Sequence, residues 1–245
     1  MLDYLYDGTF EGLLTCIYHH YYTEEASGIF ESKSYQHNML GGSMEVKTDE
    51  AKAMRVYEAI EKKISPYDLK RIYKVFLSNE ENKEYIILKY VVMGFKIGSS
   101  VSMFHGNPEV FAVQAVEKKI NVEKERMMQF VRFSEMQGGV LYAEIEPDND
   151  VIGLIAEHFC DRFKNEPFII HDIRRDKALV AYRKEWYITI FTSDDVPKKS
   201  DDEHMYQKLW KNYFDNIAIK ERKNSRCQKN FMPVRYWKHL TELKT

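Results

Sequence analysis

The residues with the clearest chemical potential form a basic run near the carboxyl end of the chain. Positions 220–240 hold seven Lys or Arg residues and one acid, Glu221, although the net charge of all 245 residues is only −2. Cations neutralise phosphates, and aromatic rings stack on bases. We therefore predict a nucleic-acid interface whose phosphate contacts are Arg222, Lys223, Arg226, Lys229, Arg235 and Lys238, with Tyr236 stacking on a base. This hypothesis fails if the protein's own acids bind these Arg and Lys side chains and leave no exposed positive face at this end of the chain.

Arg132, Arg174 and Arg175 are possible additions to this interface. Arg174 and Arg175 lie in one predicted strand-to-strand turn, and Arg183 lies in the next. Successive hairpin turns lie at opposite ends of a sheet, so at most one of them joins the basic run, and we select Arg174 and Arg175. Arg132 stands on the polar side of a predicted helix, at helical spacing from Glu125. The alternative for all three is an ordinary solvated surface.

The segment after Pro233 has the pattern of a short terminal helix. Proline suits the first position of a helix, and Val234, Trp237 and Leu240 share one face of it. Trp237 is therefore interpreted as an anchor in the body. Tyr236 points elsewhere, which makes it the better stacking residue.

Two pairs of residues are weak candidates for acid–base catalysis. Asp7 and Glu11 flank the start of a predicted helix over residues 9–22, where Asp7 or Thr9 would cap the free N–H groups. His171 and Asp172 precede the arginine pair, but neighbouring residues of a strand face opposite sides of the sheet. The sequence does not decide whether the protein is an enzyme.

No pattern predicts a metal or a cofactor. The chain lacks phosphate-loop, dinucleotide, zinc-protease and serine-hydrolase motifs. Glu146, Asp148 and Asp150 have calcium-loop spacing, but Val151 occupies the position that requires glycine. We interpret Asp148 or Asp150 as a helix cap instead. The three cysteines are widely spaced, which favours a reducing cytoplasm and no disulfides.

The composition is that of a globular protein, with 44% hydrophobic and 30% charged residues. Its most apolar window, 85–97, contains Lys89 and Lys96 and is too short for a membrane span. The first residues lack the basic start of a signal peptide. We expect a cytoplasmic protein without a membrane contact.

The hydrophobic periodicities predict an α+β fold: an antiparallel sheet covered by helices, with a basic carboxyl-terminal arm that ends in a short helix. Residues 201–219 have the wide apolar face of a helix that docks on the body. The predicted division is a body over 1–219 (helical middle 49–137, sheet-rich part 139–192, docking helix 201–219) and an arm over 220–245.

Four blocks of the sequence together resemble a bacterial family of DNA-metabolism proteins. The blocks are residues 6–15, 130–133, 170–175 and 222–242. The resemblance implies a role in DNA repair or modification beside a radical SAM protein related to spore photoproduct lyase, encoded next to it. Some relatives carry a fused uracil-DNA-glycosylase-like domain. The resemblance supplies no catalytic residues.

The leading hypothesis is a DNA-binding accessory protein that works with the radical SAM enzyme. One alternative is a scaffold whose basic arm docks an acidic protein. The other is an independent DNA-processing enzyme.

Overall fold

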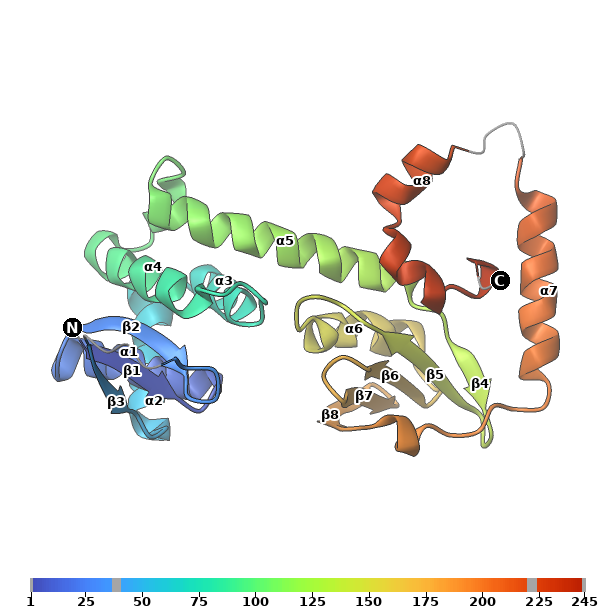
Figure 1. Ribbon diagram of the computed structural model, residues 1–245, viewed down its shortest axis with the longest axis horizontal. Helices are drawn as coiled ribbons and strands as arrows, with labels where there is room; N and C mark the ends of the chain where they lie inside the picture. Colours follow the sequence, from blue (N-terminus) through green and yellow to red (C-terminus); the bar gives the residue numbers. More distant parts are fainter. Residues whose placement is uncertain (1, 37–40, 220–223, 244–245) are drawn as a thin grey trace. The chain divides into compact units, whose positions relative to one another are not determined.

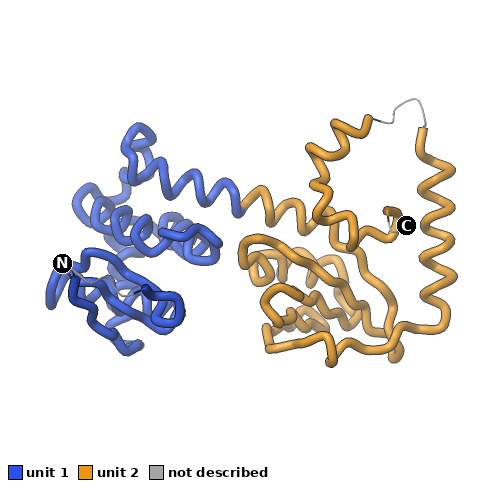
Figure 2. The backbone as a smooth tube through the Cα atoms, in the orientation of Figure 1, with its two compact units in different colours: residues 1–120 blue, residues 121–245 orange. Residues whose placement is uncertain are grey.

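A computed structural model describes residues 2–36, 41–219 and 224–243. The chain divides into two compact units, residues 1–120 and 121–245 (Figure 2). The basic arm expected at 220–245 belongs to the second unit in this division. The helix α5 begins in the first unit and ends in the second.

The first unit is built on a three-stranded parallel sheet with the order β2-β1-β3. β1 (Leu2–Tyr6) is central, and α1 (Phe10–Tyr22) carries the chain back so that β2 (Ala26–Glu31) pairs parallel to it. β3 (Gly42–Glu45) pairs parallel on the other side of β1. The antiparallel pairing that we predicted is therefore wrong here, because a strand–helix–strand sequence returns the second strand in the direction of the first.

Helices make up the rest of the first unit, as their periodicity predicts. They are α2 (Glu50–Lys63), α3 (Pro66–Phe76), α4 (Lys83–Ile97), the short 3₁₀ helix η1 (Val101–Met103) and α5 (Pro108–Phe130). Ser65 caps α3 by accepting a hydrogen bond from the Asp68 N–H, and Pro66 follows at the first helical position.

The second unit contains a five-stranded mixed sheet with the order β4-β5-β6-β7-β8 (Figure 1). Its strands are β4 (Ser134–Met136), β5 (Val140–Ile145), β6 (Phe168–Asp172), β7 (Lys177–Tyr182) and β8 (Glu185–Ile190). β5 and β6 are parallel, because α6 (Ile152–Arg162) connects them, and the other neighbours are antiparallel. The predicted antiparallel meander over the last three strands is confirmed, whereas the parallel pair was not foreseen.

The helix expected over 201–219 contacts β4, but the apolar face with which we expected it to dock is not covered by the described residues. α7 (Glu203–Ile217) has its predicted apolar face, but the face is largely exposed. Its contacts include a hydrogen bond from Trp210 Nε1 to Glu242 and one from the Glu135 N–H to Glu203. The amphipathic pattern identifies an apolar face without specifying what covers it. The exposed residues are Met205, Tyr206, Leu209, Trp210, Tyr213, Phe214 and Ile217.

The end of the chain differs from the predicted loop and terminal helix. α8 (Ser225–Phe231) is a helix where a loop was expected, and Asn224 caps it by accepting a hydrogen bond from the Cys227 N–H. Residues after Pro233 form two 3₁₀ helices, η4 (Val234–His239) and η5 (Thr241–Leu243). A further 3₁₀ helix, η2 (Ser193–Asp195), follows β8.

The predicted fold class, α+β with sheets covered by helices, is confirmed, but "antiparallel" describes only part of the sheet structure. Across the described ranges, no helix combines the length and the apolarity that a membrane crossing requires.

Candidate nucleic-acid interface

The site lies where the parallel strands β5 and β6 end. Parallel strands bring their carboxyl ends to the same edge of a sheet, which is where ligands bind in open α/β folds. Residues 146–150 follow β5, and the turn 173–176 follows β6. The predicted arginine turn is thus placed beside a row of acids. The strand–helix–strand pattern over 140–173 was the signal that could have revealed this meeting.

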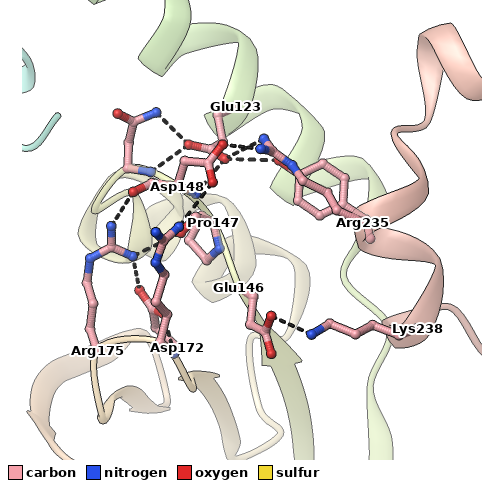
Figure 3. A network of polar contacts seen from close by, with 11 residues as sticks. Glu123, Glu146, Pro147, Asp148, Asp172, Arg175, Arg235 and Lys238 are labelled. Atoms are coloured by element: carbon pink, nitrogen blue, oxygen red, sulfur yellow. Dashed lines mark hydrogen bonds and ion pairs between the residues drawn. The ribbon is translucent and has the colours of Figure 1, made fainter. Parts of the chain in front are cut away.

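Arg175 joins the two strand ends to each other. Its guanidinium pairs with the buried Asp172 at 2.8 Å and donates hydrogen bonds to the carbonyl oxygens of Pro147 and Asp148 (Figure 3). Three of its five N–H donors are therefore used within the protein. We predicted Arg175 as a phosphate contact, but in this arrangement it holds the site together.

Two further cations meet at a single carboxylate. Asp148 accepts an ion pair from Arg174 at 3.1 Å, and Arg235 of η4 pairs with the same side chain. Lys238, one turn further along η4, pairs with Glu146 (Figure 3). These residues and Val234 line an open cleft of about 630 Å³. The structure thus brings Arg174, from the turn that we selected, beside Arg235 and Lys238 of the basic end; that these residues form a nucleic-acid surface stays a prediction.

Glu123 of α5 is the buried anchor of the site, with 4% of its side chain exposed. It accepts hydrogen bonds from the backbone N–H groups of Asp148 and Asn149, both at 2.8 Å, and from the Asn149 amide. It also accepts from the Tyr236 hydroxyl at 2.9 Å and the Arg235 guanidinium at 3.1 Å. The segment after β5 and the end of the chain are thereby fixed to one carboxylate. Sequence reasoning missed Glu123, because nothing local distinguishes it from other helical acids.

Tyr236 is not available for stacking, which corrects our prediction. It is only 2% exposed, and its hydroxyl both donates to Glu123 and accepts from Arg235. Burial and the neighbouring Glu123 charge raise the pKa of Tyr236 to about 12. Local helical spacing predicts an outward-facing Tyr236, because this spacing contains no sign of its partner Glu123, which lies 113 positions away in the sequence.

The remaining predicted cations fall into three groups. Arg226 and Lys229 are exposed on α8, and within the described residues neither forms an ion pair. Arg132 makes a two-pronged contact with Glu242, at 2.7 and 3.3 Å, and Glu242 rather than Glu125 therefore holds its guanidinium. Arg222 and Lys223 lie outside the described residues.

His171 and Asp172 face opposite sides of the sheet, as the strand geometry predicts. His171 is buried against Phe191, and its Nδ1 lies 2.8 Å from the Tyr142 hydroxyl. Burial lowers the pKa of His171. Burial also raises the pKa of Asp172, and its pair with Arg175 opposes that shift. The two side chains do not share one site.

The carboxylate of Asp7 is occupied by hydrogen bonds that hold the local structure together. It accepts hydrogen bonds from the N–H and hydroxyl of Thr9, which is the N-cap of α1, and from the Thr48 hydroxyl. Burial alone would raise the pKa of Asp7, but these hydrogen bonds lower it below its ordinary value. Glu11 is exposed in the first turn of α1. This arrangement stabilises a helix start and gives no proton donor.

The alternating acids after β5 bind cations instead of capping α6, which corrects our interpretation. Glu146 pairs with Lys238, Asp148 with Arg174 and Arg235, and Asp150 with Lys177. The N-cap of α6 is Val151, without a side-chain hydrogen bond. Within the described ranges, no group of three or more His, Cys, Asp or Glu side chains is arranged to hold a metal ion.

Residues 81–242 match the profile of a domain of unknown function, DUF4130. The matched region includes all residues of the cleft and excludes Asp7 and Glu11. No curated protein matches the chain. Among solved structures, the pGpG-specific phosphodiesterase PggH from Vibrio cholerae aligns over 89% of this chain and 100% of its own, at 8% identity and a TM-score of 0.36. A likeness at that score carries no argument about fold or function.

Proposed function

The chain belongs to the DUF4130 family, and we propose that it is a nucleic-acid-binding accessory protein in DNA repair or base modification. It would bind the phosphate backbone at the cleft between the β5 and β6 ends and η4. Its partner would be the radical SAM enzyme related to spore photoproduct lyase that the family resemblance implies.

The observation that carries this proposal is the convergence of cations in one open cleft. Arg174 comes from the turn after β6, whereas Arg235 and Lys238 come from the end of the chain. Cationic side chains from distant segments that line the same cleft suit a ligand that carries several anionic groups. Phosphate contacts of this kind position a protein on a nucleic acid without reading its sequence.

The ion pairs in the cleft do not prevent this function, because the exposed ones are weak. Arg174 and Lys238 keep more than half of their side chains exposed in their pairs with Asp148 and Glu146. Exposed pairs of this type contribute about 0–1 kcal/mol. Phosphates offer charge-assisted hydrogen bonds, and DNA releases counterions on binding. We therefore expect Arg174 and Lys238 to exchange their carboxylates for phosphates.

Arg235 is expected to remain where it is. Its partner Glu123 is buried, and removing one member of a buried pair leaves an uncompensated charge. Arg235 can face a phosphate from this fixed position. Arg175 and Arg132, which bind the nearly buried Asp172 and Glu242, are expected to act as structural contacts.

The test compares two lysines with equal exposure. Lys238 in the cleft and Lys184 in the other hairpin turn both have 57% of their side chains exposed and both pair with one acid. Affinity for a short duplex and a single strand should be measured across a salt series. We expect Lys238→Gln to weaken binding roughly 5- to 10-fold near 0.1 M salt, and to reduce the salt slope by about 0.9, because one phosphate contact is lost. Lys184→Gln should behave as wild type.

Equal losses in the two variants would show that the cleft is not the binding surface. Binding that does not depend on salt, or no binding to either DNA, would overturn the proposal.

The exposed face of α7 favours a second candidate, a scaffold that docks another protein. Large exposed apolar patches mark interaction surfaces. In co-expression with the radical SAM protein, Leu209→Glu should abolish co-purification, whereas Lys208→Glu, which places the same side chain on the polar side of α7, should not. Co-purification that survives Leu209→Glu would remove this candidate.

A further inference from the structure

β8 is an unprotected edge of the five-stranded sheet. It is the last strand in the order and pairs only with β7, so a row of its backbone N–H and C=O groups has no neighbouring strand among the described residues (Figure 1). Soluble proteins normally block such edges with charged residues, proline or bulges. Residues 186–190 contain none of these, and all are exposed, Ile190 by 84%.

The side chains on both faces of β8 suit cross-strand contacts with a strand that pairs along its free edge. Trp186, Ile188 and Ile190 alternate with Tyr187 and Thr189. Aromatic and β-branched residues are the side chains that stabilise cross-strand pairs. The absence of charge from Trp186 to Ile190 also means that two copies of this strand would meet without repulsion.

The turn that leads into β8 carries two cations in an unfavourable backbone conformation. Tyr182 pairs with Glu185, so Arg183 and Lys184 form a two-residue turn, with φ values of 50° and 69°. Such turns prefer Asn and Gly, because other residues are strained at positive φ. Strained residues persist where the position has a use.

The other end of β8 is acidic. Asp194 and Asp195 belong to η2, shortly after the strand ends. Asp195 accepts hydrogen bonds from the N–H and the hydroxyl of Thr192, the N-cap of η2, whereas Asp194 forms no ion pair within the described part of the chain. Arg183 likewise has no carboxylate partner there, although it lies over the Tyr182 ring. The strand is therefore preceded by a turn with two cations and followed by an acidic segment, and its own first residue, Glu185, leaves a net positive charge at the amino end.

We infer that β8 pairs antiparallel with β8 of a second copy of this chain, about a twofold axis at Ile188. Antiparallel pairing sets the amino end of one strand beside the carboxyl end of the other. Arg183 and Lys184 of each copy then approach Asp194 of its partner, and symmetry repeats the contact. This register places Trp186 opposite Ile190, Tyr187 opposite Thr189, and Ile188 opposite itself.

The interface is small, so the dimer should be reversible. A single pair of edge strands buries less surface than the ~1,200–2,000 Å² typical of stable complexes. We expect dissociation in the micromolar range. The inference is independent of DNA binding, because it uses the β8 edge and the ends of that strand.

Sedimentation velocity of the full chain between about 1 and 200 µM tests the inference. Wild type should shift from monomer to dimer over this range. Ile190→Lys should keep the chain monomeric, and little packing is lost because the side chain is so exposed. A sheet dimer should also tolerate Leu209→Glu on α7. The inference would be overturned if Leu209→Glu made the chain monomeric while Ile190→Lys still formed dimers. It would also be overturned if wild type stayed monomeric at every concentration.

Charge exchange tests the orientation of the strands. Arg183→Asp should weaken dimerisation roughly tenfold, because attraction becomes repulsion at two symmetric places. It should not lower thermal stability, since Asp tolerates positive φ better than Arg. Asp194→Arg should weaken dimerisation similarly, and the double exchange should restore it to within about threefold. Absence of this rescue would contradict the antiparallel register.

A disulfide tests the position of the twofold axis. In a Cys227→Ser background, which removes the exposed thiol, Ile188→Cys should give a covalent dimer under mild oxidation, because opposed strand residues lie within disulfide distance. Trp186→Cys should not, because Trp186 faces Ile190. Equal cross-linking of the two variants would contradict the axis at Ile188.

Discussion

Two neighbouring segments near the end of the chain have similar basic composition but different surroundings. α8 presents Arg226 and Lys229 to solvent and buries none of its residues. In η4, Arg235 and Lys238 bind acids of the body, and Tyr236 is buried. The two segments differ in whether their apolar residues are buried. Tyr236 of η4 and Leu240, which directly follows η4, are part of the core, whereas Phe231 of α8 is exposed.

This comparison teaches that charge alone does not decide whether a basic segment is free. Burial of Tyr236 beside Glu123 fixes the backbone of η4, and its two cations then meet the acids after β5. Removing the segment after residue 219 would therefore leave the Glu123 site without Arg235 and Tyr236. Single substitutions are needed to separate binding from folding.

The largest effect is expected at the anchor of η4. Glu123→Gln should reduce the free energy of unfolding by about 3 kcal/mol, because several buried donors and Arg235 lose a charged acceptor. Glu125→Gln, the same change two positions away at an exposed site, should stay within about 0.5 kcal/mol. Urea denaturation measures both. If the two variants are equally stable, the buried network does not hold η4.

A smaller effect is expected for the Tyr236 hydroxyl. Tyr236→Phe should cost about 1.5 kcal/mol at pH 7, the contribution of a hydrogen bond to a charged group. DNA affinity should not change, because the ring is buried. A loss of DNA affinity without a loss of stability would return Tyr236 to the stacking role that the sequence first indicated.

The cost of Tyr236→Phe should also depend on pH. The pKa of Tyr236 is raised from 10 in the unfolded chain to about 12 in the fold, so the folded state retains a proton that the unfolded state loses in this window. Wild type therefore loses stability between pH 10 and 12, by about 1.4 kcal/mol at pH 11. Urea titrations should show the variant nearly as stable as wild type there. A constant difference from pH 7 to 11 would contradict the raised pKa.

Much of the local structure was predictable from the sequence. Ser65-Pro66 and Thr9 mark helix starts, and alternation over 168–191 marks the antiparallel meander, because these signals act over a few residues. The parallel strands were missed because the direction of pairing depends on a whole strand–helix–strand unit. The Asn224 cap was the available signal for α8.

The candidate site was only partly predictable. Hairpin geometry indicates that only one of the two basic turns can join the basic end, but it does not decide that this is the Arg174 turn. The paired state of Arg235 and Lys238 did not follow, because it depends on Glu123, Glu146 and Asp148, which are about 90 to 110 positions away. Contacts at such separations leave no periodic pattern in the sequence.

The most direct test of the cleft is to remove an acid from it. Glu146→Gln frees Lys238 and deletes a negative charge beside the phosphate path. If the cleft binds nucleic acid, DNA affinity at 0.1 M salt should rise roughly fivefold, because about 1 kcal/mol of charge repulsion is removed. Affinity that falls or stays unchanged, while Glu146→Gln folds as wild type, would contradict the account.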